Sequence, residues 1–228
     1  MGGIYRLFAY LGTMALPAAL IMGFRYDPGA SSANYLFNIG LYGAFIAVHL
    51  MMTRPGFKRV VFGKPEGTSG ERRVYITVST LTWLLVLALH RPVPGPGLVV
   101  PEGVAFVALC GVLLGLFAFF EFADFAMMDG FLGVPGTVLS HSQGAETPLM
   151  TEGSYASVRH PMYRAAVWMG LASLVMHPNA GQLLWAAMIG LSFVAFIPVE
   201  EAQLRAARGD EYHSYMRQTP YRLFRGLW

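Results

Sequence analysis

Long apolar segments separated by short polar connections dominate the hydrophobic pattern of the chain. A helix needs about twenty apolar residues to cross the hydrocarbon core of a bilayer. Candidate spans of this kind occupy residues 4–24, 34–52, 73–90, 102–123, 162–177 and 180–198. The pattern therefore predicts an all-α fold, a polytopic transmembrane helical bundle with about six spans.

The C-terminal part of the pattern predicts two further elements. The segment from His177 to Gly181 contains Pro, Asn and Gly, which favour a tight turn, so we expect the last two spans to form a helical hairpin. Residues 203–215 are amphipathic with helical spacing, and Thr219 and Pro220 follow them. We expect this segment to lie as a helix along the cytoplasmic interface of the membrane.

The distribution of basic residues indicates how the chain is oriented in the membrane. Lys and Arg gather between the second and third spans and after the sixth, at Arg54, Lys58, Arg59, Lys64, Arg72, Arg73, Arg205, Arg208, Arg217, Arg222 and Arg225. The opposite connections contain only Arg25 and Arg91. The positive-inside rule then places both termini and residues 124–161 in the cytoplasm. We predict an integral protein of a bacterial inner membrane.

Composition supports a lipid bilayer as the environment and narrows the functional classes. Hydrophobic residues make up 55% of the chain and charged residues 13%, whereas soluble domains are about 25% charged. The net charge of +3 comes from short clusters between apolar segments, so nucleic acid is not an expected partner. Cys110 is the only cysteine, and no metal site is predicted.

A polar motif stands where the fifth span begins. Arg159 and His160 precede Pro161, which is well tolerated in the first turn of a helix, and Tyr163 follows. The free N–H groups and the positive end of this helix favour an anion such as a carboxylate. The alternative is that Arg159 reaches lipid phosphate and His160 caps the helix.

Two adjacent acids follow the sixth span. A hairpin returns the chain to the membrane depth at which it started, so Glu200 and Glu201 can approach Arg159 and His160. We expect both acids at the C-terminal end of a helix, where the helix dipole disfavours negative charge. They should therefore pair either with an arginine of the protein or with a positively charged ligand.

These residues carry a resemblance to a known family. The motif elements are Gly153-x-Tyr155-x-x-Val158-Arg159-His160-Pro161-x-Tyr163, then Glu200-Glu201-x-x-Leu204, then Tyr212-x-x-Tyr215 and Pro220. This core resembles the integral-membrane methyltransferases related to isoprenylcysteine carboxyl methyltransferase. Upstream, His49 and Arg54-Pro55-x-Phe57-Lys58 resemble the methanethiol S-methyltransferase branch and the related NnrU-type proteins.

The resemblance implies a cofactor and the residues that hold it. S-adenosylmethionine would bind at the cytoplasmic ends of the last two spans, beneath the C-terminal segment. Its expected binding residues are Tyr155, Arg159, His160, Pro161, Tyr163, Glu200 and Glu201. The chain would then be a single membrane domain over 1–228, with four N-terminal spans in 1–123 and the cofactor-binding core in 124–228. Ala165 departs from the family, which has Gly at that position.

The implied reaction is methyl transfer to a small or lipophilic acceptor, with a thiol as the best interpretation. A thiol reacts as its thiolate, so a proton acceptor is useful. The candidate catalytic residues are His49, Asp124 and Glu121. A buried structural histidine is the alternative for His49, and pairing with Arg159 or Arg164 is the alternative for the two acids.

Other functions remain open at this point. A prenylcysteine carboxylate or a phospholipid could be the methyl acceptor instead of a thiol. A haem or quinone protein could use His49, His90, His160 and His177 as ligands, but the predicted topology places these histidines on opposite faces of the membrane. A small transporter or signalling component is the remaining class. Residues 130–153 form the longest irregular connection, and a lid is one interpretation of them.

Overall fold

The computed structural model describes residues 2–24, 26–63, 69–121, 129, 132, 134 and 149–228. The described part is helical and contains no β-strand. Its elements are α1 (Gly2–Met22), α2 (Ala33–Thr53), α3 (Pro55–Phe62), α4 (Ser69–Leu89), α5 (Glu102–Glu121), the 3₁₀ turn η1 (Gly153–Ala156), α7 (Pro161–Met176), α8 (Ala180–Arg208) and α9 (Asp210–Gln218).

Four of these helices, α1, α2, α4 and α8, are long and apolar enough to cross a membrane. Their outward faces carry large apolar side chains that water would not favour, such as Leu36 at 75% exposure and Leu191 at 61%. Such an apolar surface is suited to contact with lipid. The all-α class predicted from the sequence is confirmed, and the fold is that of an integral membrane protein.

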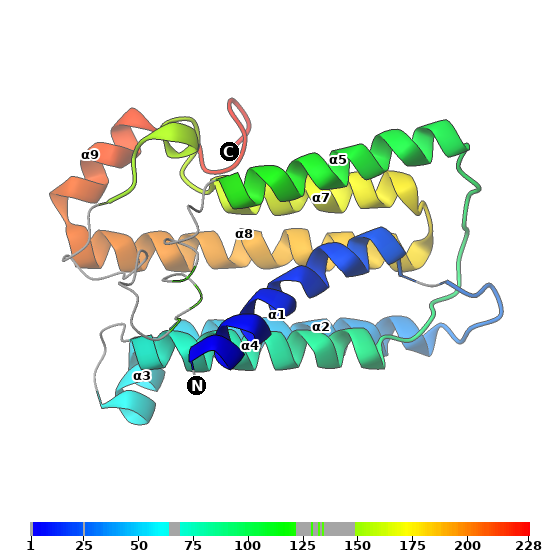
Figure 1. Ribbon diagram of the computed structural model, residues 1–228, viewed down its shortest axis with the longest axis horizontal. Coiled ribbons are helices and arrows are strands. Elements are labelled where there is room, and N and C mark those ends of the chain that lie inside the picture. Colours follow the sequence, from blue (N-terminus) through cyan, green and yellow to red (C-terminus); the bar gives the residue numbers. More distant parts are fainter. Residues whose placement is uncertain are drawn as a thin grey trace.

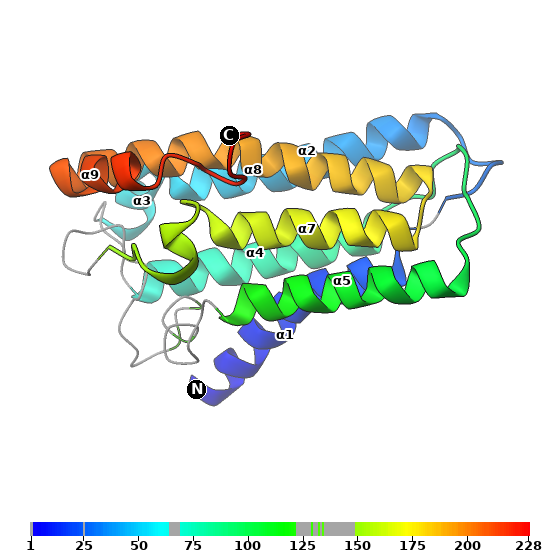
Figure 2. The same ribbon diagram turned by 90° about the horizontal axis from the view of Figure 1, so that it is seen from above.

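The helices pack as a layered bundle (Figures 1 and 2). Helix α5 packs on α7, α7 lies beside α8, and α2 contacts both α4 and α8, while α1 runs obliquely across α4, α5 and α7. Small residues allow the closest of these approaches. A Cβ atom added at Gly115 of α5 would lie 2.6 Å from Cγ of Met169 on α7, so a larger residue there would have to displace the Met169 side chain.

Fully buried polar side chains tie the end of α1 to α7 and α8. Ser173 of α7 donates a hydrogen bond to the carbonyl oxygen of Leu20 over 2.7 Å. Gln182 of α8 donates to the Ser173 hydroxyl over 2.7 Å and accepts from the backbone N–H of Phe24 over 2.9 Å. Polar groups at membrane depth need such partners, because an unpaired one costs several kcal/mol. This network caps the last turn of α1.

Residues 91–97, which we call the proline strap, join the helices at the end of the bundle away from α3 and α9 (Figure 1). Its prolines lack N–H groups, so the strap offers mainly carbonyl oxygens. Arg91 O accepts from the side-chain amide of Asn38 at 2.8 Å, Pro94 O from the hydroxyl of Tyr35 at 2.5 Å, and Pro96 O from the backbone N–H of Ala180 at 3.2 Å. The strap therefore binds α2 and α8 together.

Helix α8 is longer than the sequence predicted. It continues through Pro198 to Arg208 instead of ending near residue 198. The acids Glu200 and Glu201 therefore lie inside the helix and not at its C-terminal end, where Arg205 and Arg208 instead match the helix dipole. Burial, and not the dipole, is the reason that Glu201 needs cationic partners.

Residues 203–215 do not form the single amphipathic helix expected for them. The helix breaks at Gly209, whose backbone φ of +52° is a value that residues other than glycine rarely adopt. Beyond this residue α9 runs in a new direction (Figure 1). The short helix α3, which begins at Pro55, was not predicted by the sequence analysis.

We expect Asn38→Ala to lower the free energy of unfolding by about 2–4 kcal/mol. Asn38 is 0% exposed, and its side chain both donates to Arg91 O and accepts from Arg91 N–H at 3.1 Å, so the substitution leaves two backbone groups unpaired. Unfolding in detergent micelles measures the change. Ser32→Ala is the matched control, since the exposed Ser32 makes no side-chain cap at the start of α2. Equal stability of the two variants would contradict a structural role for the strap.

Candidate functional site

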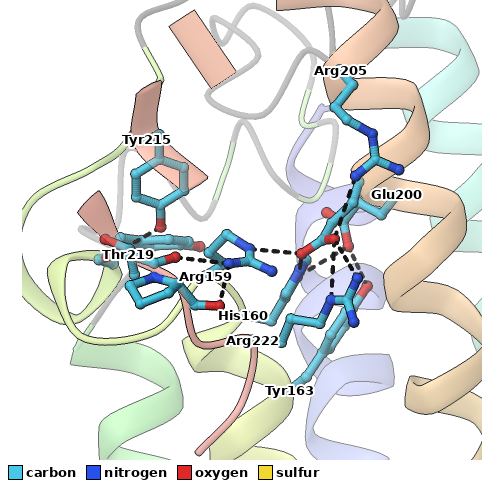
Figure 3. A network of polar contacts seen from close by, with 11 residues as sticks. Arg159, His160, Tyr163, Glu200, Arg205, Tyr215, Thr219 and Arg222 are labelled. Atoms are coloured by element: carbon cyan, nitrogen blue, oxygen red, sulfur yellow. Dashed lines mark hydrogen bonds and ion pairs between the residues drawn. The ribbon is translucent and has the colours of Figure 1, made fainter. Parts of the chain in front are cut away.

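One buried carboxylate organises the end of the bundle where α7 begins (Figure 3). The side chain of Glu201 is 0% exposed and contacts four basic side chains. Its Oε1 atom lies 2.7 Å from Nε of Arg159 and 3.3 Å from Nε2 of His160. Its Oε2 atom lies 3.1 Å from the Arg222 guanidinium and 3.7 Å from Arg205. We call these five residues the Glu201 cluster.

Arg159 links α8 to the C-terminal tail. Besides its ion pair with Glu201, its Nη1 atom donates to the carbonyl oxygens of Thr219 at 2.8 Å and Pro220 at 2.6 Å. Its backbone N–H donates to Tyr221 O at 2.9 Å. The Arg159 side chain is only 5% exposed, so its charge is already matched within the protein. The Arg159 guanidinium therefore already has its hydrogen-bond and charge partners within the protein.

His160 and Pro161 set the start of α7. His160 is the N-cap residue but makes no side-chain cap, and its ring instead lies between the two acids, with Nδ1 3.6 Å from Glu200 Oε2. Pro161 occupies the first helical position, as the sequence predicted. The His160 ring stacks on Tyr163 with 5.5 Å between the ring centroids. The aromatic rings therefore fix the orientation of the imidazole.

Glu200 differs from its neighbour in exposure. Its side chain is 34% exposed, and its Oε2 atom accepts a hydrogen bond from the Tyr163 hydroxyl at 3.0 Å. The Tyr163 ring also stacks on Phe193 of α8 at 4.7 Å, which holds the hydroxyl in place. Glu200 is thus a positioned carboxylate that still reaches the surface of the site, whereas Glu201 does not.

Tyr155, in the 3₁₀ turn η1, reaches the site from the other side. Its backbone carbonyl accepts from the Tyr215 hydroxyl at 2.8 Å, which joins η1 to α9. Burial, helped by the charge of Glu200, raises the pKa of Tyr155 to about 12. The Tyr155 hydroxyl is therefore a neutral hydrogen-bond donor under physiological conditions.

Curated proteins similar to this chain share one name. The methanethiol S-methyltransferase 2 of Bradyrhizobium diazoefficiens is 30% identical over 92% of this chain and 80% of its own length. The methanethiol S-methyltransferase of Mycobacterium tuberculosis is 30% identical over 79% of this chain and 74% of its own length. That of Crocosphaera subtropica is 28% identical, over 81% and 72%.

The chain belongs to the methanethiol S-methyltransferase family. Neither a family model nor a solved structure matches it. The sequence resemblance to this branch is confirmed by the relatives. The alignment to the Bradyrhizobium relative named above covers 92% of the chain.

The residues predicted to bind a cofactor in this family member come together in the structure. Side-chain contacts join five of them, namely Arg159, His160, Tyr163, Glu200 and Glu201. Pro161 follows His160 as the first residue of α7, and a hydrogen bond from Tyr215 to the backbone of Tyr155 places η1 beside α9. Glu121 is the last residue of α5, where only its backbone is described. Asp124 lies outside the described residues.

His49 lies apart from the Glu201 cluster, in an aromatic group between α2, α4 and α8. Its ring packs against Phe45 at 4.1 Å, Tyr75 at 5.7 Å and Phe196 at 6.4 Å. Its Nδ1 atom lies 2.8 Å from the carbonyl oxygen of Phe45, which can only accept, so Nδ1 carries the proton. In the neutral ring Nε2 is then an acceptor, as a base requires.

The resemblance implied that the C-terminal segment covers the site, but no residue of the tail was predicted to contribute to it. Arg222 neutralises Glu201, and the backbone of residues 219–222 pairs with Arg159 and His160. Arg222 is itself held by Trp228, whose carbonyl oxygen accepts from Arg222 N–H at 2.8 Å. The motif around Pro220 was visible in the sequence, but no periodic pattern indicated that the tail folds back over α7.

We expect Glu201→Gln to lower the free energy of unfolding by about 3–5 kcal/mol, because it leaves the buried Arg159 without its counter-ion. Glu200→Gln is the matched control one residue away. Its amide can still accept from Tyr163, and the side chain is partly exposed, so we expect a loss of at most about 1 kcal/mol. Denaturant unfolding in micelles compares them, and similar losses would contradict the central role of Glu201.

Proposed function

We propose that the protein is a membrane-embedded methyltransferase that transfers the methyl group of S-adenosylmethionine to methanethiol or a similar small thiol. The observation that carries this proposal is its similarity to relatives named methanethiol S-methyltransferase over most of the chain. The clustered carboxylates and cations at the start of α7 support it independently, since the donor is a zwitterion with an added sulfonium charge.

The residues of the site fit such a donor. Glu200 presents a positioned and partly exposed carboxylate, which suits an ammonium group. The buried Glu201 and Arg159 neutralise one another, so they hold the walls of the site together and do not contact the ligand directly. When bound, S-adenosylmethionine supplies a methyl group already activated by the sulfonium, and the protein has mainly to orient the two reactants and exclude water.

The acceptor thiol has to lose its proton. We assign this step to His49, whose Nε2 atom is the free acceptor of a ring fixed through Nδ1. The rings of Phe45 and Tyr75 pack against this imidazole and fix its position. Asp124 and Glu121 remain the alternative bases. The apolar walls around His49 also suit a small, apolar thiol better than a charged acceptor.

We further propose that α5 and α7 bring the number of membrane spans to six and that the site faces the cytoplasm. Helix α5 is apolar throughout its middle, and α7 packs between α5 and α8 and is apolar for most of its length. The basic residues of α3 and of the segment after Glu201 lie at the same end as the site (Figure 1). Labelling of single cysteines placed at Val60 and Val99 from each side of sealed vesicles tests this orientation.

Purified protein in lipid nanodiscs should form dimethyl sulfide from methanethiol and isotope-labelled S-adenosylmethionine, measured by headspace mass spectrometry. We expect Glu200→Gln to lower kcat/KM by about tenfold, since the ligand ammonium loses a charged partner. Glu102→Gln, at an exposed position on α5 at the far end of the bundle, is the control and should match wild type. Methylation of a prenylcysteine or phospholipid without methylation of thiols would refute the assignment of the acceptor.

His49→Phe tests the base. The phenyl ring preserves packing against Phe45 and Tyr75 but removes the proton acceptor, so we expect kcat to fall by roughly 10²-fold or more. Affinity for S-adenosylhomocysteine, measured by calorimetry, should stay unchanged. If the activity of His49→Phe equals that of wild type, His49 is not the acceptor of the thiol proton. The same measurement on Asp124→Asn and Glu121→Gln then shows which of these two acids accepts it.

A further inference from the structure

A small cavity lies on the seam between α7 and α8, which run side by side (Figure 1). Small residues of both helices leave this space open: Ala166 and Gly170 on α7, and Ala186 and Gly190 on α8. The volume of the cavity is about 40 Å³. A cavity needs about 10–15 Å³ to hold one water molecule, so this one has room for about three heavy atoms.

The cavity adjoins the two stacked rings that hold Glu200 in place, Tyr163 of α7 and Phe193 of α8. Residues three apart lie on the same face of a helix. Ala166 follows Tyr163 by three residues on α7, and Gly190 precedes Phe193 by three residues on α8. The seam between the helices therefore runs from the candidate site, past the stacked rings and into the cavity.

The walls of the cavity suit an uncharged ligand. The residues described around it are all apolar, and Leu171 at its edge is 46% exposed, so the cavity is open toward lipid. Trp185 forms an aromatic wall that is 1% exposed and stacks on Phe24 at 5.3 Å. A Cβ atom added at Gly170 would lie 3.8 Å from Cζ3 of Trp185, so the edge of the indole faces Gly170. Ring edges carry partial positive charge and make favourable contacts with sulfur.

We propose that this cavity binds the uncharged methyl thioether that the reaction produces, between its formation at the site and its release into the bilayer. This assignment rests on the proposed function. Dimethyl sulfide has three heavy atoms, which match the volume of the cavity, and its sulfur contacts the edge of Trp185. The side chains around the cavity offer no acceptor for an S–H group, so a thioether suits it better than the thiol.

Fluorine NMR of protein that contains 5-fluorotryptophan tests this site, because the fluorine is attached to Cζ3. The chain has four tryptophans, and Trp185→Phe assigns the signal. In lipid nanodiscs we expect dimethyl sulfide to shift this signal saturably, at a concentration about threefold lower than that of propane, a hydrocarbon of the same size. Equal binding of propane would make the cavity a general apolar space, and equal binding of methanethiol would make it a thiol site. Either result would overturn the proposal.

Gly170→Ala combined with Gly190→Ala fills the cavity without strain. The first added Cβ makes an ordinary contact with Trp185, and the second has no neighbouring atom within 4 Å. We expect this double variant to require at least about tenfold more dimethyl sulfide for the same shift. Gly40→Ala combined with Gly43→Ala is the matched control on the exposed face of α2, where an added Cβ also has no neighbour within 4 Å, and it should respond as wild type does.

Both double variants should unfold at the temperature of wild type or above it, because alanine favours a helix over glycine. An unchanged response in the filled variant would overturn the site. If wild type forms dimethyl sulfide from methanethiol but its Trp185 signal does not respond, this inference fails and the proposed function stands. If wild type forms no dimethyl sulfide, the proposed function fails, and the assignment of the ligand fails with it.

Discussion

A carboxylate with no access to water determines how the site end of this bundle is built. Glu201 is fully buried, and a buried carboxylate is tolerated only when cations and hydrogen-bond donors surround it. Those donors come from the start of α7, from α8 itself and from the tail after α9. Segments far apart in the sequence must therefore meet before the charge is neutralised. The fold of the tail over α7 follows from this requirement.

Adjacent acids on one helix take different tasks because successive residues point about 100° apart. Glu201 turns into the cluster and contributes to stability, whereas Glu200 turns to a partly exposed position where Tyr163 and His160 orient it. The Glu201 carboxylate is therefore used for contacts within the protein, whereas the Glu200 carboxylate is still accessible to a ligand. Arg159 and Arg205 differ in a similar way. The Arg159 guanidinium donates two hydrogen bonds to backbone carbonyl oxygens, whereas Arg205 makes a 3.7 Å contact with Glu201.

The parts of this structure that follow from local pattern could be predicted from the sequence, and the parts that depend on long-range pairing could not. Apolar length predicted the long helices, and the Arg-His-Pro motif with the paired acids predicted which residues meet. The end of α8 was misplaced because Pro198 is normally a signal for a break, yet a proline with its neighbours packed inside a bundle need not end a helix. Arg222 could not be selected among several tail arginines, because its role depends on a chain reversal held by Trp228.

The two ends of the bundle are stabilised by different chemistry, and this bears on how the site can admit a ligand. At the strap end, neutral hydrogen bonds join Asn38, Tyr35 and Gln182 to backbone groups, so every contact has a fixed direction. At the site end, ion pairs dominate, and charges tolerate a change of partner better than directional bonds do. Arg205 lies 3.7 Å from Glu201, whereas Arg159 and Arg222 contact the same carboxylate at 2.7 Å and 3.1 Å. Because several cations surround this one acid, the buried charge of Glu201 stays neutralised even when its longest contact opens.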